Sequence, residues 1–108
     1  VLGEDFSRPF FAVCQHWPRG TRPAGFDKPL STKVPALLMS GELDPVTPPE
    51  YGARVAKALP NARHVVLKGQ GHNVIATGCM PKLVGQFIER ADAKALDTKC
   101  LDSIGPVP

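Results

Sequence analysis

The chain lacks several features that would assign it to a class at once. Its 108 residues contain no apolar run near the roughly 20 residues that a membrane helix needs. It has one Trp and one Tyr, and its Lys and Arg residues are spread along the chain. A net charge of +3 without a basic, aromatic-rich stripe does not favour nucleic-acid binding. We therefore expect neither a nucleic-acid partner nor a membrane span.

Cysteine is scarce, and no two cysteines form a C-x-x-C pair. Cys14, Cys79 and Cys100 thus give no sign of a zinc ribbon or a thioredoxin-like redox site. Cys14 and His16 are too few to hold a metal, so we expect no metal and no cofactor. The spacing leaves two alternatives open, either one disulfide with one thiol left over or three free thiols.

Twelve prolines and ten glycines divide the chain into two regions. Residues 1–33 are predicted to be an irregular connector with a short helix between residues 6 and 17. Closely spaced prolines and glycines after that helix exclude another long element. Residues 34–108 carry the clearer periodicity and are predicted to hold the ordered α/β segment.

The second region is predicted to form a strand, a helix, a strand and a helix in that order. The apolar run 35–39 has no polar alternation, which is typical of a strand buried on both faces. An amphipathic helix is expected over 48–59, with Thr47 as its N-cap. A second strand is expected over 63–67 and a second amphipathic helix over 82–91.

Two parallel strands make an incomplete sheet, because parallel strands need cover on both faces and neighbours at both edges. A chain this short also buries little surface against the entropy of folding. We therefore expect an α/β fold that is the C-terminal part of a larger sheet, with a homodimer as the alternative. The tail after Lys94 is predicted to fray.

An acid and an imidazole follow the two predicted strands. Asp44 lies in the loop after the first strand, and His72 lies in the loop after the second. The carboxyl ends of neighbouring parallel strands share one edge of the sheet, where ligands of open α/β sheets bind. We therefore predict that Asp44 and His72 meet there. Taken singly, Asp44 is also typical of a turn residue, and His72 of an ordinary loop histidine.

Two motifs carry a resemblance to a known superfamily. The segment 35–48, PALLMSGELDPVTP, resembles the strand and loop that hold the catalytic acid of α/β-hydrolases, and the segment 69–72, GQGH, resembles their histidine loop. Within that superfamily the chain is most similar to the C-terminal region of the tripeptidyl-aminopeptidase and proline-iminopeptidase-like branch. Cys14 before Trp-Pro, and Cys79 and Cys100 on either side of a helix, carry this closer resemblance.

The resemblance implies a serine hydrolase in which Asp44 orients His72 and His72 acts as general base and acid. The nucleophile is missing, because no serine lies in a G-x-S-x-G elbow. The serines are Ser7, Ser31, Ser40 and Ser103. We therefore expect a C-terminal segment that is inactive alone, whose partner is the N-terminal part of the same hydrolase with its nucleophilic Ser.

The branch further implies a peptidase that releases short N-terminal peptides or residues. Glu4 and Asp5 are then candidates to bind the amino group of a peptide substrate. Members of the branch are often exported, so a Cys79–Cys100 disulfide and a secreted or periplasmic location are expected. An esterase on the same scaffold and a non-catalytic α/β binding module are the alternatives. A G-x-S-x-G elbow in the upstream sequence would support the hydrolase, and its absence would support the binding module.

Overall fold

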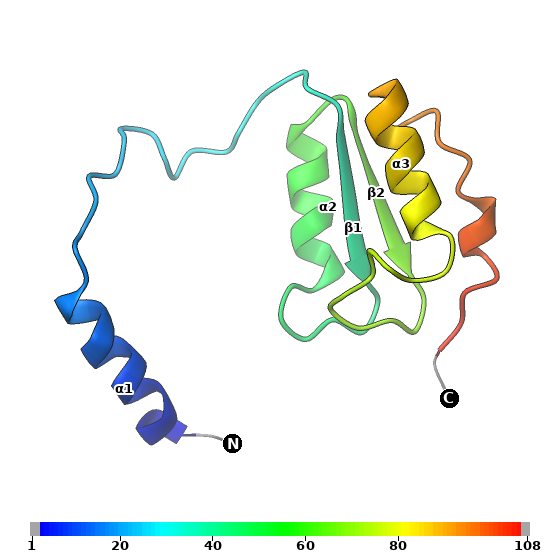
Figure 1. The fold of residues 1–108 in the computed structure, drawn as a ribbon. Coiled ribbons are helices and arrows are strands. Elements are labelled where there is room, and N and C mark those ends of the chain that lie inside the picture. Colours follow the sequence, from blue (N-terminus) through cyan, green and yellow to red (C-terminus); the bar gives the residue numbers. More distant parts are fainter. Residues whose placement is uncertain (1–2, 107–108) are drawn as a thin grey trace.

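The computed structural model describes residues 3–106, and it places two strands and two helices in one body with a third helix apart from it (Figure 1). The expected order of strand, helix, strand and helix is observed. The elements are α1 (Gly3–His16), β1 (Ala36–Gly41), α2 (Pro49–Ala58), β2 (Ala62–Leu67), α3 (Met80–Arg90) and the 3₁₀ helix η1 (Lys99–Leu101).

The strands β1 and β2 are parallel and in direct register, with Ala36 opposite Ala62 and Gly41 opposite Leu67. The helix α2 connects them, as a parallel pair requires. Side chains alternate across a strand, so the two faces of the sheet carry different residues. Among the described residues the sheet has these two strands, which agrees with an incomplete α/β sheet.

The hydrophobic core lies on the face of the sheet that α3 covers. Its buried members come from β2, from the loop after it and from α3, the helix that lies over this face in Figure 1. Leu67 and Met80 are almost completely buried, and Leu37 and Met39 of β1 pack against the same cluster. The helix α2 covers the opposite face, where the backbone of Gly52 lies against the ring of His64.

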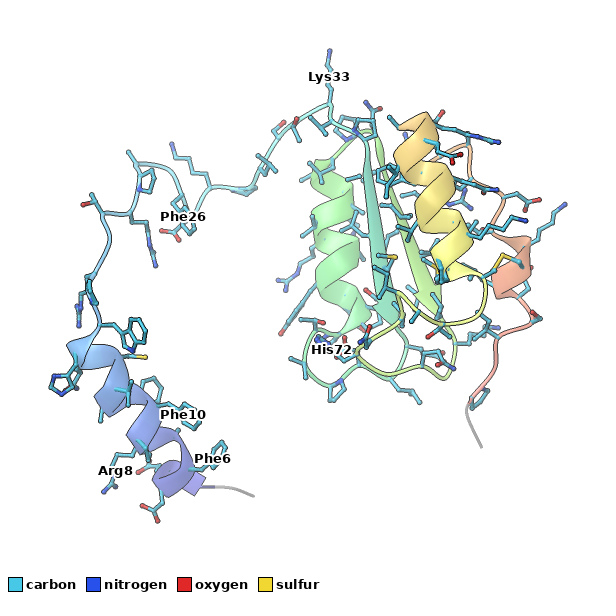
Figure 2. The ribbon with its side chains drawn as sticks, in the orientation of Figure 1. Phe6, Arg8, Phe10, Phe26, Lys33 and His72 are labelled. Carbon is cyan, nitrogen blue, oxygen red and sulfur yellow. A yellow bond between two sulfur atoms is a disulfide. The ribbon has the colours of Figure 1, made fainter. Side chains whose placement is uncertain are left out.

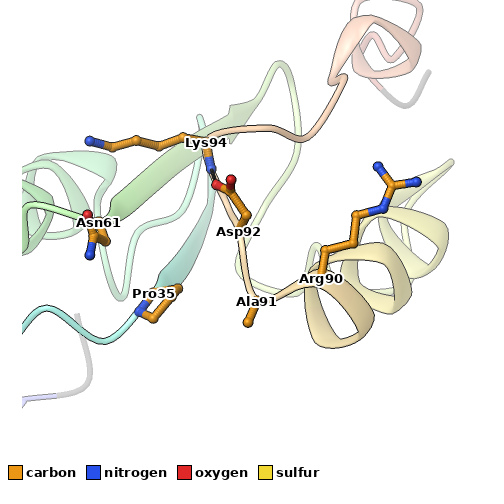
Figure 3. Close-up of a pocket in the computed structure, with 6 residues that line it drawn as sticks. All are labelled: Pro35, Asn61, Arg90, Ala91, Asp92 and Lys94. Atoms are coloured by element: carbon orange, nitrogen blue, oxygen red, sulfur yellow. Dashed lines mark hydrogen bonds between the residues drawn. The ribbon is translucent and has the colours of Figure 1, made fainter.

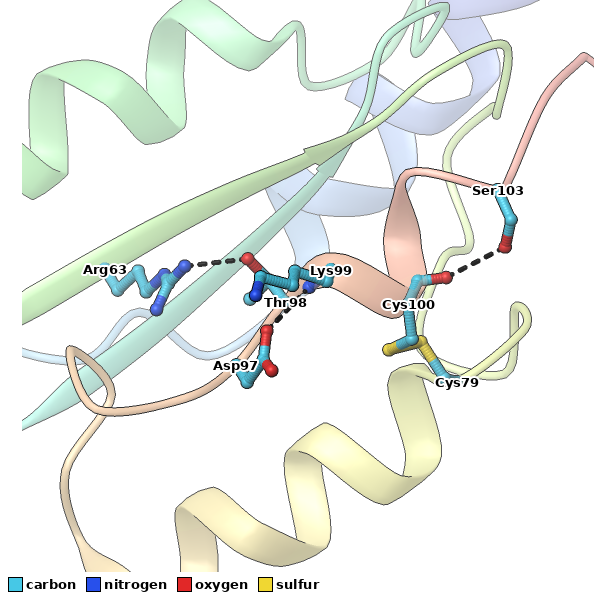
Figure 4. Close-up of a disulfide and its surroundings, with 7 residues drawn as sticks. All are labelled: Arg63, Cys79, Asp97, Thr98, Lys99, Cys100 and Ser103. Carbon is cyan, nitrogen blue, oxygen red and sulfur yellow. Dashed lines mark hydrogen bonds between the residues drawn. A yellow bond between two sulfur atoms is a disulfide. The ribbon is translucent and has the colours of Figure 1, made fainter.

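The C-terminal tail is ordered, so the prediction that it frays after Lys94 is wrong. The Arg63 guanidinium of β2 donates to the carbonyls of Lys94 and Leu96 and, at 2.7 Å, to the hydroxyl of Thr98 (Figure 4). Leu96 itself is buried. A single charged donor thus holds the backbone of the tail against the sheet.

The Cys79–Cys100 disulfide ties the start of α3 to η1 (Figure 4). The bridge joins two positions 21 residues apart in the sequence. The expected tail clamp is therefore present. The third cysteine, Cys14, is free and exposed on α1.

The helix α1 is longer than expected and begins at Gly3, with Pro9 inside it. Its aromatic side chains are largely exposed, and the rings of Phe6 and Phe10 lie 5.5 Å apart (Figure 2). An extended segment with a turn near Phe26 links α1 to the body (Figure 2). The irregular connector predicted for this region corresponds to that segment.

Replacing Arg63 by Met keeps its apolar stem and removes its donors. We expect Arg63→Met to lower the free energy of unfolding by about 2 kcal/mol, because a charged donor to two carbonyls and one hydroxyl is lost. Urea unfolding followed by circular dichroism measures this. Arg90→Met, at the exposed end of α3, is the matched control and should stay within about 0.5 kcal/mol. Equal effects of the two substitutions would contradict the role given to Arg63.

Candidate active site

The end of β1 and the loop after β2 approach each other at backbone distance. A Cβ at Gly41 would lie 1.9 Å from the carbonyl oxygen of Gly71, so no side chain fits at position 41. The amide of Leu43 donates to the carbonyl of Gln70 at 2.9 Å, and the amide of Gly69 donates to the Glu42 carboxylate at 2.8 Å. These contacts fix the two loops relative to each other.

This approach brings Asp44 and His72 together at the carboxyl edge of the sheet. His72 Nδ1 lies 2.9 Å from Asp44 Oδ2. The Asp44 side chain is 2% exposed and the His72 side chain 59% exposed. Figure 2 shows His72 at the end of the body to which the strands point. The predicted meeting of the acid and the imidazole is therefore present in the fold.

The Asp44 carboxylate is held by its own loop. Its Oδ1 accepts from the amides of Val46 and Thr47 at 2.8 and 3.0 Å. Its Oδ2 accepts from the Thr47 hydroxyl at 2.7 Å, in addition to His72. Such bonds from an Asp to the amides two and three residues later form an Asx turn. The turn therefore fixes the plane of the carboxylate independently of His72.

Thr47 is a site residue that sequence reasoning missed. It was predicted as the N-cap of α2, but the N-cap is Pro48, without a side-chain hydrogen bond. The Thr47 hydroxyl instead serves Asp44, and its oxygen lies 3.3 Å from His72 Nδ1. The signal was the spacing Asp-Pro-Val-Thr, in which a threonine three residues after an aspartate can close an Asx turn.

Hydrogen bonding determines the charge of Asp44. Burial alone raises the pKa of this carboxyl, because it disfavours the charged form. The bonds from the amide and hydroxyl of Thr47, and then those from His72 and the Val46 amide, outweigh burial and hold the pKa of Asp44 well below its usual range. Asp44 is therefore ionised at neutral pH.

An ionised carboxylate only accepts hydrogen bonds, so the proton between Asp44 and His72 belongs to Nδ1 of the ring. The other ring nitrogen, Nε2, is then unprotonated in the neutral imidazole and free to accept a proton. The exposed ring offers this nitrogen to a reacting group. The arrangement is suited to general base and acid chemistry.

The other candidate residues lie elsewhere. Glu4 and Asp5 are exposed in the first turn of α1, where Asp5 faces Arg8 at 3.8 Å. The helix α1, which carries both residues, lies apart from the body that holds His72 (Figure 1), so the structure does not bring them to His72. Their role in substrate binding stays a prediction.

The buried serine Ser40 contacts a different histidine. Its Oγ lies 2.9 Å from Nε2 of His64, on the face of the sheet that α2 covers. Burial lowers the pKa of His64. This pair is thus separate from the Asp44–His72 pair, and the nucleophile expected beside His72 is not Ser40.

A hollow of about 510 Å³ lies at the opposite edge of the sheet (Figure 3). Pro35 and Asn61 precede the two strands, and the remaining lining comes from the end of α3 and the turn after it. This hollow is therefore remote from Asp44 and His72 and does not serve them as a substrate pocket. Within residues 3–106 no three His, Cys, Asp or Glu side chains gather as a possible metal site.

The family of TAP-like proteins matches residues 1–100. The chain belongs to this family. It corresponds to the C-terminal region of tripeptidyl-aminopeptidase-like α/β-hydrolases, as the resemblance implied. No curated protein and no solved structure matched the chain. None of the helices within residues 3–106 has the length and apolar content to cross a membrane.

Removing the Thr47 hydroxyl tests how the TAP-like segment sets the charge of its acid. We expect Thr47→Val to raise the pKa of Asp44, because Oδ2 loses a donor at 2.7 Å. Thr47→Ser keeps the donor and should restore the wild-type titration. The ¹³C shift of the Asp44 carboxyl against pH measures both. An unchanged titration in Thr47→Val would assign the low pKa to the backbone amides and His72, without the Thr47 hydroxyl.

The low pKa of Asp44 also makes stability depend on pH. The pKa of Asp44 is about 3.9 in the unfolded chain, and hydrogen bonding holds it well below that value in the folded chain. Its contribution is therefore complete above about pH 5, begins to fall near about pH 4, and is lost progressively as the pH drops further towards the lower folded-state pKa. The difference in free energy of unfolding between the wild type and Asp44→Asn should shrink over this window in urea titrations. A difference that stays constant would contradict the assignment.

Proposed function

We propose that this chain supplies the acid and the histidine of a Ser-Asp-His triad, and that the serine lies in the N-terminal part of the same hydrolase. The observation that carries the proposal is the 2.9 Å contact between an exposed imidazole and a buried, fixed carboxylate. Membership of the TAP-like hydrolase family supports it. The separate Ser40–His64 pair supports a nucleophile from outside these residues.

In the proposed reaction, His72 Nε2 takes the proton of the serine hydroxyl as the serine oxygen attacks the substrate carbonyl carbon. Asp44 keeps the second ring proton on Nδ1 and stabilises the imidazolium that forms. The imidazolium then protonates the leaving group as the acyl-enzyme forms. Water attacks the acyl-enzyme with the same ring as base, and the serine is regenerated.

The Asx turn gives this proposal its physical basis. Orientation contributes to catalysis only if the orienting group is itself fixed. Both oxygens of Asp44 accept hydrogen bonds from Val46 and Thr47, in addition to the bond with His72. The carboxylate can therefore hold the imidazole without reorganising when the ring becomes positive.

The proposed substrates are peptides from which short N-terminal units are released, as the family resemblance implies. Glu4 and Asp5 would bind the substrate's amino group once α1 is seated against the rest of the enzyme. An esterase on the same scaffold would use the same acid and histidine. The Cys79–Cys100 disulfide is compatible with the proposed secreted or periplasmic location.

The test replaces the two proposed triad members in the complete hydrolase that carries this segment. We expect His72→Ala to lower kcat by about 10⁶-fold, because the base is lost, and Asp44→Asn by about 10⁴-fold, because the ring tautomer is lost, with little change in KM. Hydrolysis of a tripeptide p-nitroanilide with a free N-terminus measures this.

Asp92→Asn is the matched control, because Asp92 also accepts from two amides of its own turn, Lys94 and Ala95. It lies at the opposite edge of the sheet and should leave turnover unchanged. Loss of less than tenfold in Asp44→Asn would mean that another residue is the acid. Full turnover in His72→Ala would remove the triad proposal.

A further inference from the structure

We propose that the C-terminal tail, residues 102–106, is a positioning element for the loop 69–72, and that the Cys79–Cys100 disulfide keeps it in place. The inference rests on the proposed function, because the loop matters through His72. Residues 102–106 make no hydrogen bond to Asp44 or His72, so their proposed effect on the site passes through the loop 69–72.

The tail touches the loop directly before His72. Gly69 has a φ of +65°, and a Cβ there would lie 2.4 Å from the Cα of Pro106. The side-chain Nε2 of Gln70 donates to the carbonyl of Gly105 at 2.8 Å. Two consecutive residues of the loop are thus held by two consecutive residues of the tail.

The opposite side of the same loop rests on β1. There the backbone of Gln70 and Gly71 lies against Gly41, with no space for a side chain. The loop therefore packs between the end of β1 on one side and the tail on the other. Glycines at positions 69 and 71 give the loop little conformational preference of its own, so contacts from both sides must define where His72 stands.

The tail reaches this position from the disulfide. Ile104 packs on the hydrophobic core, and its Cδ1 would lie 2.7 Å from a Cβ at Gly78, next to Cys79. Cys100 lies four residues earlier and is bonded to Cys79. The bridge therefore starts the tail beside the segment between His72 and α3, and Ile104 directs it back over the loop.

The hydrogen bonds of Arg63 do not hold the part of the tail that follows the disulfide. Its guanidinium holds the backbone up to Thr98, before η1 (Figure 4). Beyond Thr98 the covalent bond at Cys100 and the Ile104 contact determine the path to Gly105. Removing the tail beyond Ser103 should consequently free the loop while leaving the disulfide and the Arg63 contacts in place.

Two variants test this in the 108-residue chain. The first ends after Ser103, which deletes the contacts to Gly69, Gln70 and Gly78. The second is Gln70→Glu, which puts a carboxylate against the Gly105 carbonyl in place of a donor. Gln86→Glu on α3 makes the same chemical change away from the loop and is the matched control.

The readout is amide hydrogen exchange together with the ¹⁵N spectrum of the His72 ring. We expect exchange at Gly69 and Gln70 to rise about tenfold in both test variants, with protection in β2 and α3 kept. The His72 Nδ1–H signal should broaden or disappear in the same variants. Gln86→Glu should match the wild type.

Two outcomes would overturn the inference. Unchanged exchange at Gly69 and Gln70 in the truncated chain would show that β1 alone holds the loop. A uniform rise across β2 and α3 would show that the tail stabilises the whole fold and does not position the loop in particular.

The parent hydrolase gives the second test. Gln70→Glu should lower kcat by about 10²-fold with KM nearly unchanged, the loss expected when a catalytic group is misplaced by about 1 Å. Failure of the triad proposal is recognised separately, because His72→Ala would then keep its turnover. Hydrogen exchange in the 108-residue chain tests whether the tail positions the loop, whether or not the triad proposal holds.

Discussion

The close approach of two backbones at Gly41 is the constraint on which the site depends. The loop after β2 can lie against the end of β1 only because position 41 has no side chain. From that contact follow the hydrogen bond from the Leu43 amide to the Gln70 carbonyl and the short distance from Asp44 to His72. An acid and a base 28 residues apart in sequence thus become neighbours without either loop being long or rigid by itself.

The general rules of parallel sheets made much of this predictable. The continuous apolar run that became β1 indicated a strand buried on both faces, and the periodicity of α3 indicated a helix. From these, the meeting of Asp44 and His72 followed by topology alone. Thr47 was missed because the helix that follows made a capping role more plausible. Only the structure shows that its hydroxyl donates to Asp44.

The tail could not be predicted for a different physical reason. Beyond Thr98 its order comes from the Cys79–Cys100 disulfide and the packing of Ile104. Up to Thr98 it comes from the side chain of Arg63, about 30 residues away, acting on backbone carbonyls. Such contacts leave no periodic trace in the sequence, because the accepting groups are the same for every residue type. The disulfide was expected only through family resemblance, since the spacing of the cysteines alone was equally consistent with free thiols.

The burial of Asp44 contrasts with the exposure of the His72 ring, the sheet edges and the aromatic side chains of α1. Asp44 is buried with each oxygen engaged, whereas the ring that it orients remains open to solvent. Both strands lack an outer neighbour within the described residues, and the aromatic face of α1 is uncovered. Each of these unmet requirements is of the kind that the remaining strands of an α/β-hydrolase satisfy. The acid and histidine of the proposed triad are therefore assembled within these residues, whereas the proposed nucleophile has to come from outside them.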